Sequence, residues 1–157
     1  MILICYDGSP DAREAIARGA VLLPGQRATV LTVWHPFDAS ALGLTGGTVD
    51  TQEVDDASRR HAQSQADEGA RVATEAGLDA APRTADLRTT IADTILGEAD
   101  AVDADAILMG SRGLTGVRSL LLGSVSHAVI QHADRPVIVV PSPEVSTART
   151  RARTAEG

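Results

Sequence analysis

The sequence predicts an α/β fold in which helices cover both faces of a parallel sheet. Short apolar or β-branched runs alternate along the chain with segments whose apolar residues recur at helical spacing. Strands separated by helices form right-handed βαβ units, which build parallel sheets. The 157 residues, 43% of them hydrophobic, suit one domain with one core. We place this domain at residues 1–143 and expect a disordered C-terminal tail at 144–157.

The first strand and the first helix are predicted from local signals. The run from Ile2 to Tyr6 is typical of a buried strand. The turn Asp7-Gly8-Ser9-Pro10 follows, with Ser9 as the N-cap and Pro10 at the first helical position. Pro24-Gly25 ends this helix, whose apolar positions are Ala12, Ala15, Ile16, Ala20 and Leu23.

The remaining elements continue the alternation of strand and helix patterns. They are, in order, a strand at 28–34, a long glycine-containing loop at 35–50, a polar alanine-rich helix at 51–76, a weak strand at 78–87, a helix at 91–102, a strand at 106–109, a helix at 125–133 and a strand at 136–140.

The segment after the strand at 106–109 is typical of a loop that holds phosphates. It reads Gly110-Ser111-Arg112-Gly113 and, after nine residues, Gly123-Ser124-Val125-Ser126 where a helix begins. Such glycines supply positive φ angles or let the backbone approach a ligand, and free N–H groups at a helix start face an anion. A purely structural interpretation also exists, in which glycine makes the turn and serine caps the helix.

Two loops are expected to meet across a crevice. Ligands of open α/β sheets bind outside the carboxyl ends of the strands, where the winding direction reverses. The loop Asp7-Gly8-Ser9 and the loop from Gly110 to Ser126 both leave the carboxyl ends of predicted strands. Asp7 also has a structural interpretation, as an acidic residue near a helix N-terminus.

Composition excludes several classes of function. The net charge of −7 and the three aromatic residues argue against nucleic acid and anionic membranes as partners. All fourteen basic residues are arginine, which excludes the Gly-Lys-Ser/Thr phosphate loop and Schiff-base chemistry. The N-terminal apolar run meets Asp7 too early for a signal peptide or a membrane helix, so we expect a cytoplasmic protein.

Cysteine and histidine predict neither a redox pair nor a metal site. Cys5 is the only cysteine, and its place in an apolar run favours a buried, inert thiol. His127 and His132 are five residues apart and lie on different faces of a helix. His35 follows the second strand near the crevice, where a histidine is commonly a solvent-facing turn residue.

At this point the chain resembles the universal stress protein family. The start from Ile2 to Ser9 is similar to that family's first strand and Asp-Gly-Ser turn, and Gly110-x-x-Gly113 with Gly123-Ser124 matches its ATP-binding signature. The stretch Pro136–Val140 is similar to its last strand, so the resemblance covers about Met1 to Pro141. It implies a Rossmann-like sheet of the adenine nucleotide alpha hydrolase-like type, with five strands in the order 3-2-1-4-5, a homodimer and bound ATP.

The resemblance also implies how ATP is held. Asp7 is expected to contact the adenosine half, with the adenine between Val33 and Met109, and Mg²⁺ is expected to be held mainly by the phosphates. Arg112 or Arg118 either offsets phosphate charge or is merely solvated. The expected nucleotide-binding set is Asp7, Ser9, Val33, Met109, Gly110, Arg112, Gly113, Gly123, Ser124, Val125 and Ser126.

The last strand supplies the expectation of a homodimer. At a sheet edge this strand would leave apolar side chains and unpaired backbone groups in water. We therefore expect an antiparallel pairing of two copies about a two-fold axis. The residues concerned are Val137, Ile138, Val139 and Val140.

Three classes of function follow from the sequence. The first is an ATP-binding regulatory or stress-response module whose nucleotide stabilises one conformation or dimer. The second is a slow ATPase or nucleotidyl-transfer enzyme, although beyond Asp7 the two loops offer no clear general base and no lysine. The third is a structural dimer that has kept the fold and binds another ligand or none.

Overall fold

Five parallel strands form one sheet in the order β3-β2-β1-β4-β5, as predicted. A computed structural model describes residues 1–36, 51–113, 122–143, 146–147 and 150 of the chain. The strands are β1 (Ile2–Cys5), β2 (Arg27–Trp34), β3 (Asp79–Asp86), β4 (Ala106–Gly110) and β5 (Val137–Val140). The chain reverses its winding direction between β1 and β4, which are neighbours with Ile2 opposite Ala106. The carboxyl ends of these two strands therefore flank the position where a ligand is expected.

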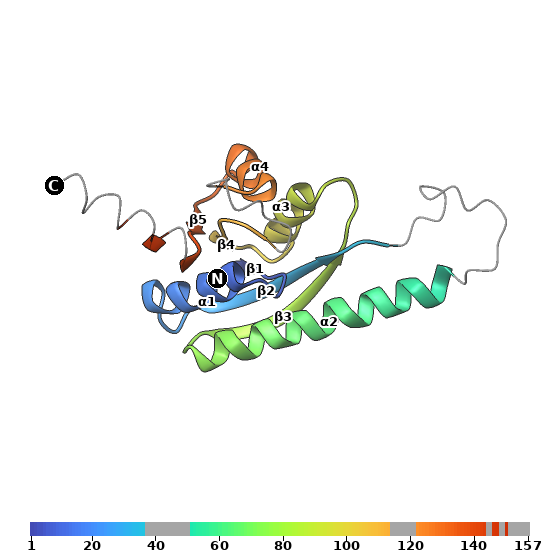
Figure 1. Ribbon diagram of the computed structural model, residues 1–157, viewed down its shortest axis with the longest axis horizontal. Coiled ribbons are helices and arrows are strands. Elements are labelled where there is room, and N and C mark those ends of the chain that lie inside the picture. The colour runs from blue at the N-terminus through green and yellow to red at the C-terminus, as the bar shows by residue number, and fades with distance from the viewer. Residues whose placement is uncertain (37–50, 114–121, 144–145, 148–149, 151–157) are drawn as a thin grey trace.

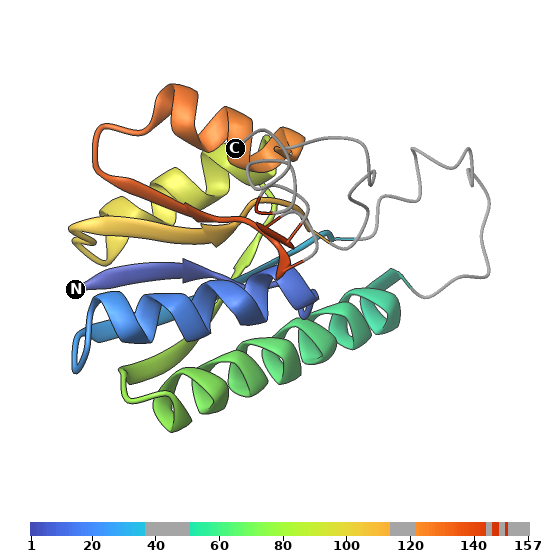
Figure 2. The same cartoon turned by 60° about the vertical axis from the view of Figure 1, so that its left-hand side comes forward.

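In the described part of the chain, helices α1 to α4 cover the two faces of the sheet (Figures 1 and 2). Helices α1 (Pro10–Leu22) and α2 (Thr51–Glu75) share one core cluster, whereas α3 (Ile91–Ala101) and α4 (Ser124–His132) share the other. Side chains alternate across β1, so that Ile2 and Ile4 face the first cluster and Leu3 faces the second. The inner strands β1, β2 and β4 are thus buried on both faces, which explains their continuous apolar runs.

Local signals account for most helix boundaries. Ser9 caps α1, because its Oγ accepts a hydrogen bond from the N–H of Ala12 at 3.2 Å, and Pro10 opens the helix as predicted. Thr90 caps α3 in the same way through the N–H of Asp93. The weak strand signal at β3 has a structural cause: β3 lies at a sheet edge, where Pro82 is tolerated.

Two expectations concern segments outside the described residues. These are the loop at 35–50, of which only 35–36 is described, and most of the tail at 144–157. The boundary of the domain at 143 therefore stays a prediction. Within the described ranges, no helix is long and apolar enough to cross a bilayer.

Candidate functional site

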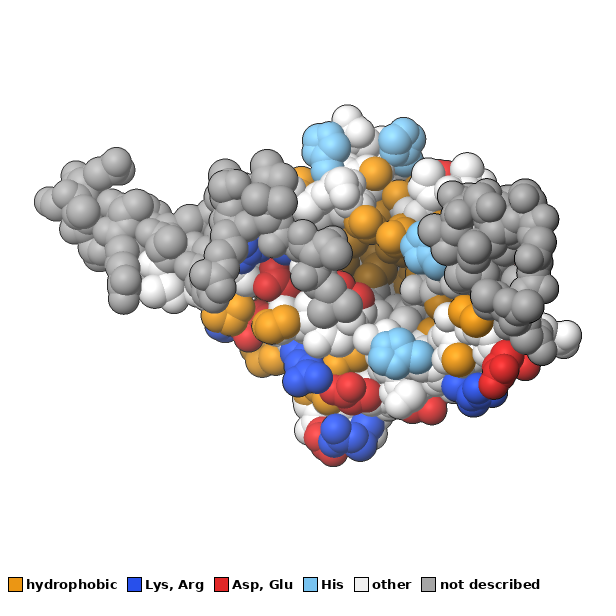
Figure 3. Space-filling view, turned by 45° about the vertical axis from the view of Figure 1, so that its right-hand side comes forward, with side chains coloured by type: hydrophobic (Ala, Val, Ile, Leu, Met, Phe, Trp, Pro, Cys, Tyr) orange, Lys and Arg blue, Asp and Glu red, His pale blue; other side chains and the backbone are white. Residues whose placement is uncertain are grey.

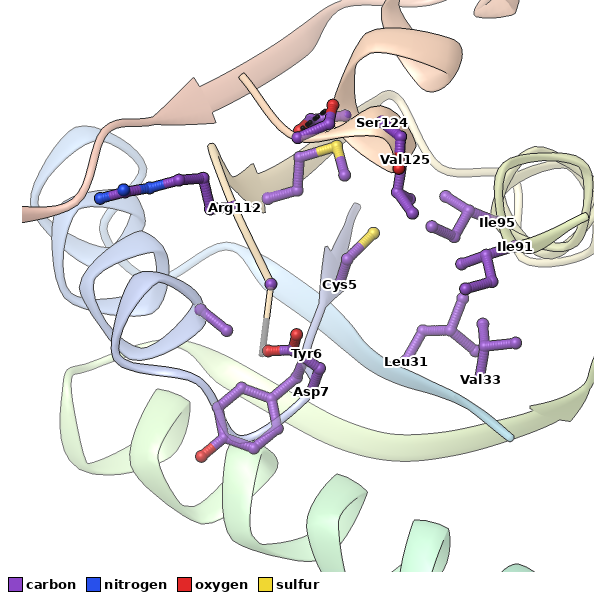
Figure 4. A pocket seen from close by; sticks show the side chains of 16 residues that line it. Cys5, Tyr6, Asp7, Leu31, Val33, Ile91, Ile95, Arg112, Ser124 and Val125 are labelled. Atoms are coloured by element: carbon purple, nitrogen blue, oxygen red, sulfur yellow. Dashed lines mark hydrogen bonds between the residues drawn. The ribbon is translucent and has the colours of Figure 1, made fainter. Parts of the chain in front are cut away.

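A pocket opens at the carboxyl ends of β1 and β4, at the predicted crevice (Figure 4). Its volume is about 350 Å³, and it is lined from β1, β2, β4 and the first turns of α1, α3 and α4. Figure 3 shows a hollow with hydrophobic side chains gathered inside it. The pocket brings together nearly all the predicted nucleotide-binding residues, namely Asp7, Val33, Met109, Gly110, Arg112, Gly113, Gly123, Ser124, Val125 and Ser126.

One end of the pocket is apolar. Ile91 and Ile95 lie one turn apart on α3 and point toward Leu31 and Val33 of β2 (Figure 4). Met109 and Val125 extend this lining, and most of these side chains belong to the α3–α4 core cluster. A flat apolar group is therefore favoured at this end, because it excludes water without leaving a buried polar atom unpaired.

The other end is polar and is built around Asp7. The Asp7 Oδ1 accepts a hydrogen bond from the N–H of Ser9 at 3.0 Å, and Gln65 Nε2 donates to the Asp7 carbonyl at 3.2 Å. Gly8 takes a positive φ of 77°, which lets the chain turn sharply from β1 into α1. These contacts fix the Asp7 carboxylate against the loop after β4.

The start of α4 presents backbone N–H groups to the pocket. Gly123 is the N-cap, and its own N–H donates to the Ser111 carbonyl at 2.7 Å, so the helix amides that remain for a ligand begin at Ser124. The first turn consists of Ser124, Val125 and Ser126. Their N–H groups have no acceptor within the helix, because no helical carbonyl precedes them by one turn. An anion bound there gains from these N–H groups and from the helix dipole.

The glycines of the signature serve close approach rather than unusual backbone angles. Among the described residues, the glycines with positive φ are Gly8, Gly25 and Gly77. The positive-φ alternative is therefore wrong for Gly110, Gly113 and Gly123. A Cβ on Gly110 would lie 2.9 Å from the Asp11 carbonyl carbon, and a Cβ on Gly113 would lie 2.6 Å from Asp7 Oδ2.

Several predicted polar groups are engaged within the protein. Ser9 is buried beneath the turn as the α1 cap and does not line the pocket. Ser126 lines it, but its Oγ donates to the Ser111 carbonyl at 2.9 Å. The side chain of Arg112 is 8% exposed and turns away from the pocket toward α1 (Figure 4). Solvation of Arg112 is thus the wrong alternative, and Arg118 lies outside the described residues.

Cys5 departs from its prediction as a core thiol. Its side chain is partly exposed and lines the pocket between the apolar and polar ends (Figure 4). Removal from bulk water, together with the nearby Asp7 charge, raises the pKa of the thiol from 9.0 to about 12. The thiol therefore stays protonated at neutral pH, and its inertness, unlike its burial, follows from the structure.

Sequence reasoning missed several lining residues besides Cys5. Leu31, Ile91 and Ile95 form much of the apolar wall, and Tyr6 and Ala12 complete the opposite side. One signal was present: Ile91 and Ile95 are four residues apart and open the helix that follows β3, so they share the face directed at the carboxyl edge of the sheet.

A second, more open hollow adjoins the pocket across Val33, which lines both. Trp34, the exposed His35 and His61 border it, and the Arg59 guanidinium lies 5.3 Å from the centre of the Trp34 ring. No group of three potential metal ligands from His, Cys, Asp and Glu occurs in the part of the chain that the structure describes.

The family is decided by sequence comparison. The model of the universal stress protein family matches residues 1–141. The chain belongs to this family. Two curated universal stress proteins illustrate the relationship: YxiE of Bacillus subtilis is 29% identical over 88% of this chain and 97% of its own length. The protein in the QAH/OAS sulfhydrylase 3′ region of Thermus aquaticus is 33% identical over 88% and 96%.

Solved structures, two of them of universal stress proteins, share the fold. The protein MJ0577 superposes with a TM-score of 0.70 at 22% identity, covering 89% of this chain and 94% of its own. The Archaeoglobus fulgidus protein in complex with dAMP gives 0.58 at 23%, covering 88% and 95%. An Arabidopsis thaliana protein with AMP bound gives 0.60 at 15%, covering 93% and 94%. These likenesses support the five-stranded architecture of the universal stress protein fold described above.

Proposed function

We propose that this universal stress protein binds ATP in the pocket between Asp7 and the start of α4. The observation that carries the proposal is the continuity of one cavity, which joins an apolar slot to the first turn of α4. Its volume of about 350 Å³ lies within the range of small-ligand pockets. The adenine-nucleotide complexes of the Archaeoglobus and Arabidopsis relatives support the same ligand class.

Charge and polarity orient the nucleotide within the cavity. The adenine enters the apolar slot between Val33 and Met109, where it buries apolar surface. The Asp7 carboxylate repels phosphates and accepts hydrogen bonds, so it faces the ribose hydroxyls. The phosphates extend to the N–H groups of Ser124 and Val125 at the helix start. Mg²⁺ is held mainly by the phosphate oxygens, since these supply the negative charge it requires.

The proposed role is nucleotide-dependent regulation in the cytoplasm rather than catalysis. The described lining contains one carboxylate, that of Asp7, and no histidine. Phosphoryl transfer needs an oriented base and cations on the leaving phosphate, and the chain has no lysine to add to the proposed Mg²⁺. A slow ATPase or nucleotidyl-transfer enzyme remains the second candidate, followed by a ligand-free structural dimer.

The dimer is proposed to form through β5. This strand lies at the sheet edge. The carbonyl of Pro136, just before β5, accepts a hydrogen bond from the N–H of Ile107 in β4, and the Val140 carbonyl accepts one from Ser111, just after β4. Backbone groups alternate in direction along a strand, so those of Val137 and Val139 face away from β4. A second copy of β5, related by a two-fold axis, would pair with them.

Calorimetry on protein stripped of co-purified nucleotide tests the proposal. We expect heat on titration with ATP and a rise in the melting temperature, because a ligand that binds the folded state stabilises it. Gly123→Val should abolish the heat, since its methyl groups enter the phosphate path. Its Cβ would lie 3.3 Å from the Ser111 carbonyl oxygen, a tight contact that requires the backbone to shift by a few tenths of an ångström, so we expect the circular dichroism spectrum to be kept. No heat and no shift at millimolar ATP would favour the ligand-free dimer, and hydrolysis at about one turnover per second or faster would favour the enzyme.

A further inference from the structure

The loop after β4 is held by a buried charged pair that reaches α1. Arg112 Nε lies 3.6 Å from Asp11 Oδ2, and the two side chains are 8% and 11% exposed. Asp11 sits in the first turn of α1 and also accepts a hydrogen bond from Ser111 Oγ at 3.3 Å. A buried charge is costly unless it is paired, so removal of either partner leaves the other unfavourably placed.

The same arginine contacts the chain beyond β5. Arg112 Nη2 donates to Ser142 Oγ, and Ser142 is itself buried. One residue earlier, the Ser111 N–H donates to the Val140 carbonyl at 2.8 Å. The loop is therefore fastened on one side to α1 and on the other to the end of β5.

The Ser111 carbonyl connects this anchored loop to the start of α4. Its carbonyl accepts hydrogen bonds from the Gly123 N–H at 2.7 Å and from Ser126 Oγ at 2.9 Å. These two residues stand at the N-cap and in the first turn of α4. A displacement of residues 111–112 thus moves the N–H groups that the pocket presents.

We propose that Asp11 and Arg112 are positioning residues, which set the start of α4 for the phosphates without Arg112 touching the nucleotide. This inference rests on the proposed ATP site. It assigns the arginine of the signature to the protein's interior, where its guanidinium is satisfied by Asp11 and Ser142. A phosphate-binding role would instead require Arg112 to leave both partners.

Asp11→Asn separates these two roles by the sign of its effect. If the pair positions the loop, the loss of the carboxylate charge should weaken ATP binding about tenfold, because the ion pair that holds Arg112 is lost. If Arg112 binds phosphate, removal of its competing carboxylate should leave ATP binding unchanged or tighter, which would overturn the proposal. Glu14→Gln, on the same helix in an exposed pair with Arg18, is the matched control and should bind ATP like the wild type.

A second readout needs no nucleotide. Hydrogen exchange of the apo protein should be faster at the bonded amides of Gly123 and His127 in Asp11→Asn than in the wild type, with α3 unchanged as the internal reference. Ser142→Ala removes the hydroxyl that accepts the hydrogen bond from Arg112 and should give the same pattern more weakly, which keeps the test available if Asp11→Asn unfolds. Unchanged exchange of the Gly123 and His127 amides in a folded variant refutes the positioning role. Failure of the wild type to bind ATP refutes the proposed function and leaves this exchange test intact.

Discussion

The Asp7 carboxylate occupies the space that a side chain on residue 113 would need. A Cβ built on Gly113 lies 2.6 Å from Asp7 Oδ2, well inside van der Waals contact. The carboxylate cannot simply rotate away, because its Oδ1 holds the N–H of Ser9. The loop after β1, which contains Asp7, and the loop after β4, which contains Gly113, therefore constrain each other, although more than 100 residues separate them along the chain.

Gly113→Ala should destabilise the protein by about 1–3 kcal/mol, the usual cost of overpacking. Asp7→Ala removes the clashing oxygen, so in that background the same glycine substitution should cost less than about 0.5 kcal/mol. Urea denaturation of the four proteins in this double-mutant cycle measures the coupling. Additive costs would show that Asp7 does not restrict residue 113.

Ser124→Pro and Ser124→Ala separate the amide of Ser124 from its hydroxyl. Ser124 is the first helical residue after the Gly123 N-cap, where proline is well tolerated. Ser124→Ala should weaken ATP binding by about 0.5–1.5 kcal/mol, the net value of one hydrogen bond. Ser124→Pro also removes the N–H and should weaken it further at the same melting temperature. Equal affinities of the two variants in calorimetry would mean that this amide does not bind phosphate.

The Cys5 thiol should react slowly with iodoacetamide at pH 9.0, because desolvation of this partly exposed side chain and then the Asp7 charge raise its pKa to about 12. Its rate should rise with pH toward that value, and ATP should suppress it. The raised pKa also means that the protonated Cys5 thiol contributes to the free energy of unfolding. This contribution is fully present below pH 9.0 and is lost as pH rises toward 12. Cys5→Ala should lose less stability over this interval, as measured by denaturant unfolding. If the wild type and Cys5→Ala lost the same stability over this pH interval, the raised pKa of Cys5 would be contradicted.

Val139→Pro tests pairing through β5. The substitution removes an outward N–H without disturbing the carbonyls that bond to β4, and proline is accepted on edge strands. We expect a monomer in analytical ultracentrifugation, whereas Val139→Ala, which keeps the N–H, should stay dimeric. Val21, which is 79% exposed on α1, offers a competing apolar contact. If Val21→Glu dissociates the dimer and Val139→Pro does not, the interface lies at α1.

The parts of the molecule that follow local rules could be predicted from the sequence. The cap at Ser9, the stop at Pro24-Gly25 and the alternation along β1 depend on neighbours in the chain, and the meeting of the loops after β1 and β4 follows from the crossover rule.

What the sequence could not show depends on contacts between distant segments. The direction of Arg112 is set by Asp11, about 100 residues away. The exposure of Cys5 arises because α3 and α4 leave a cavity above the end of β1. Neither the spacing of apolar residues nor the composition of the sequence carries such information.

A tryptophan next to the residue shared by the two hollows provides an intrinsic fluorescence signal. Trp34 is the only tryptophan in the chain and directly follows Val33, whose side chain lines the pocket. We expect a base that settles against Val33 to shift the end of β2 and so to change the surroundings of Trp34, whose ring lies beneath the Arg59 guanidinium. Occupancy of the pocket should then be measurable by the emission of this native fluorophore, without a label or a chemically modified nucleotide.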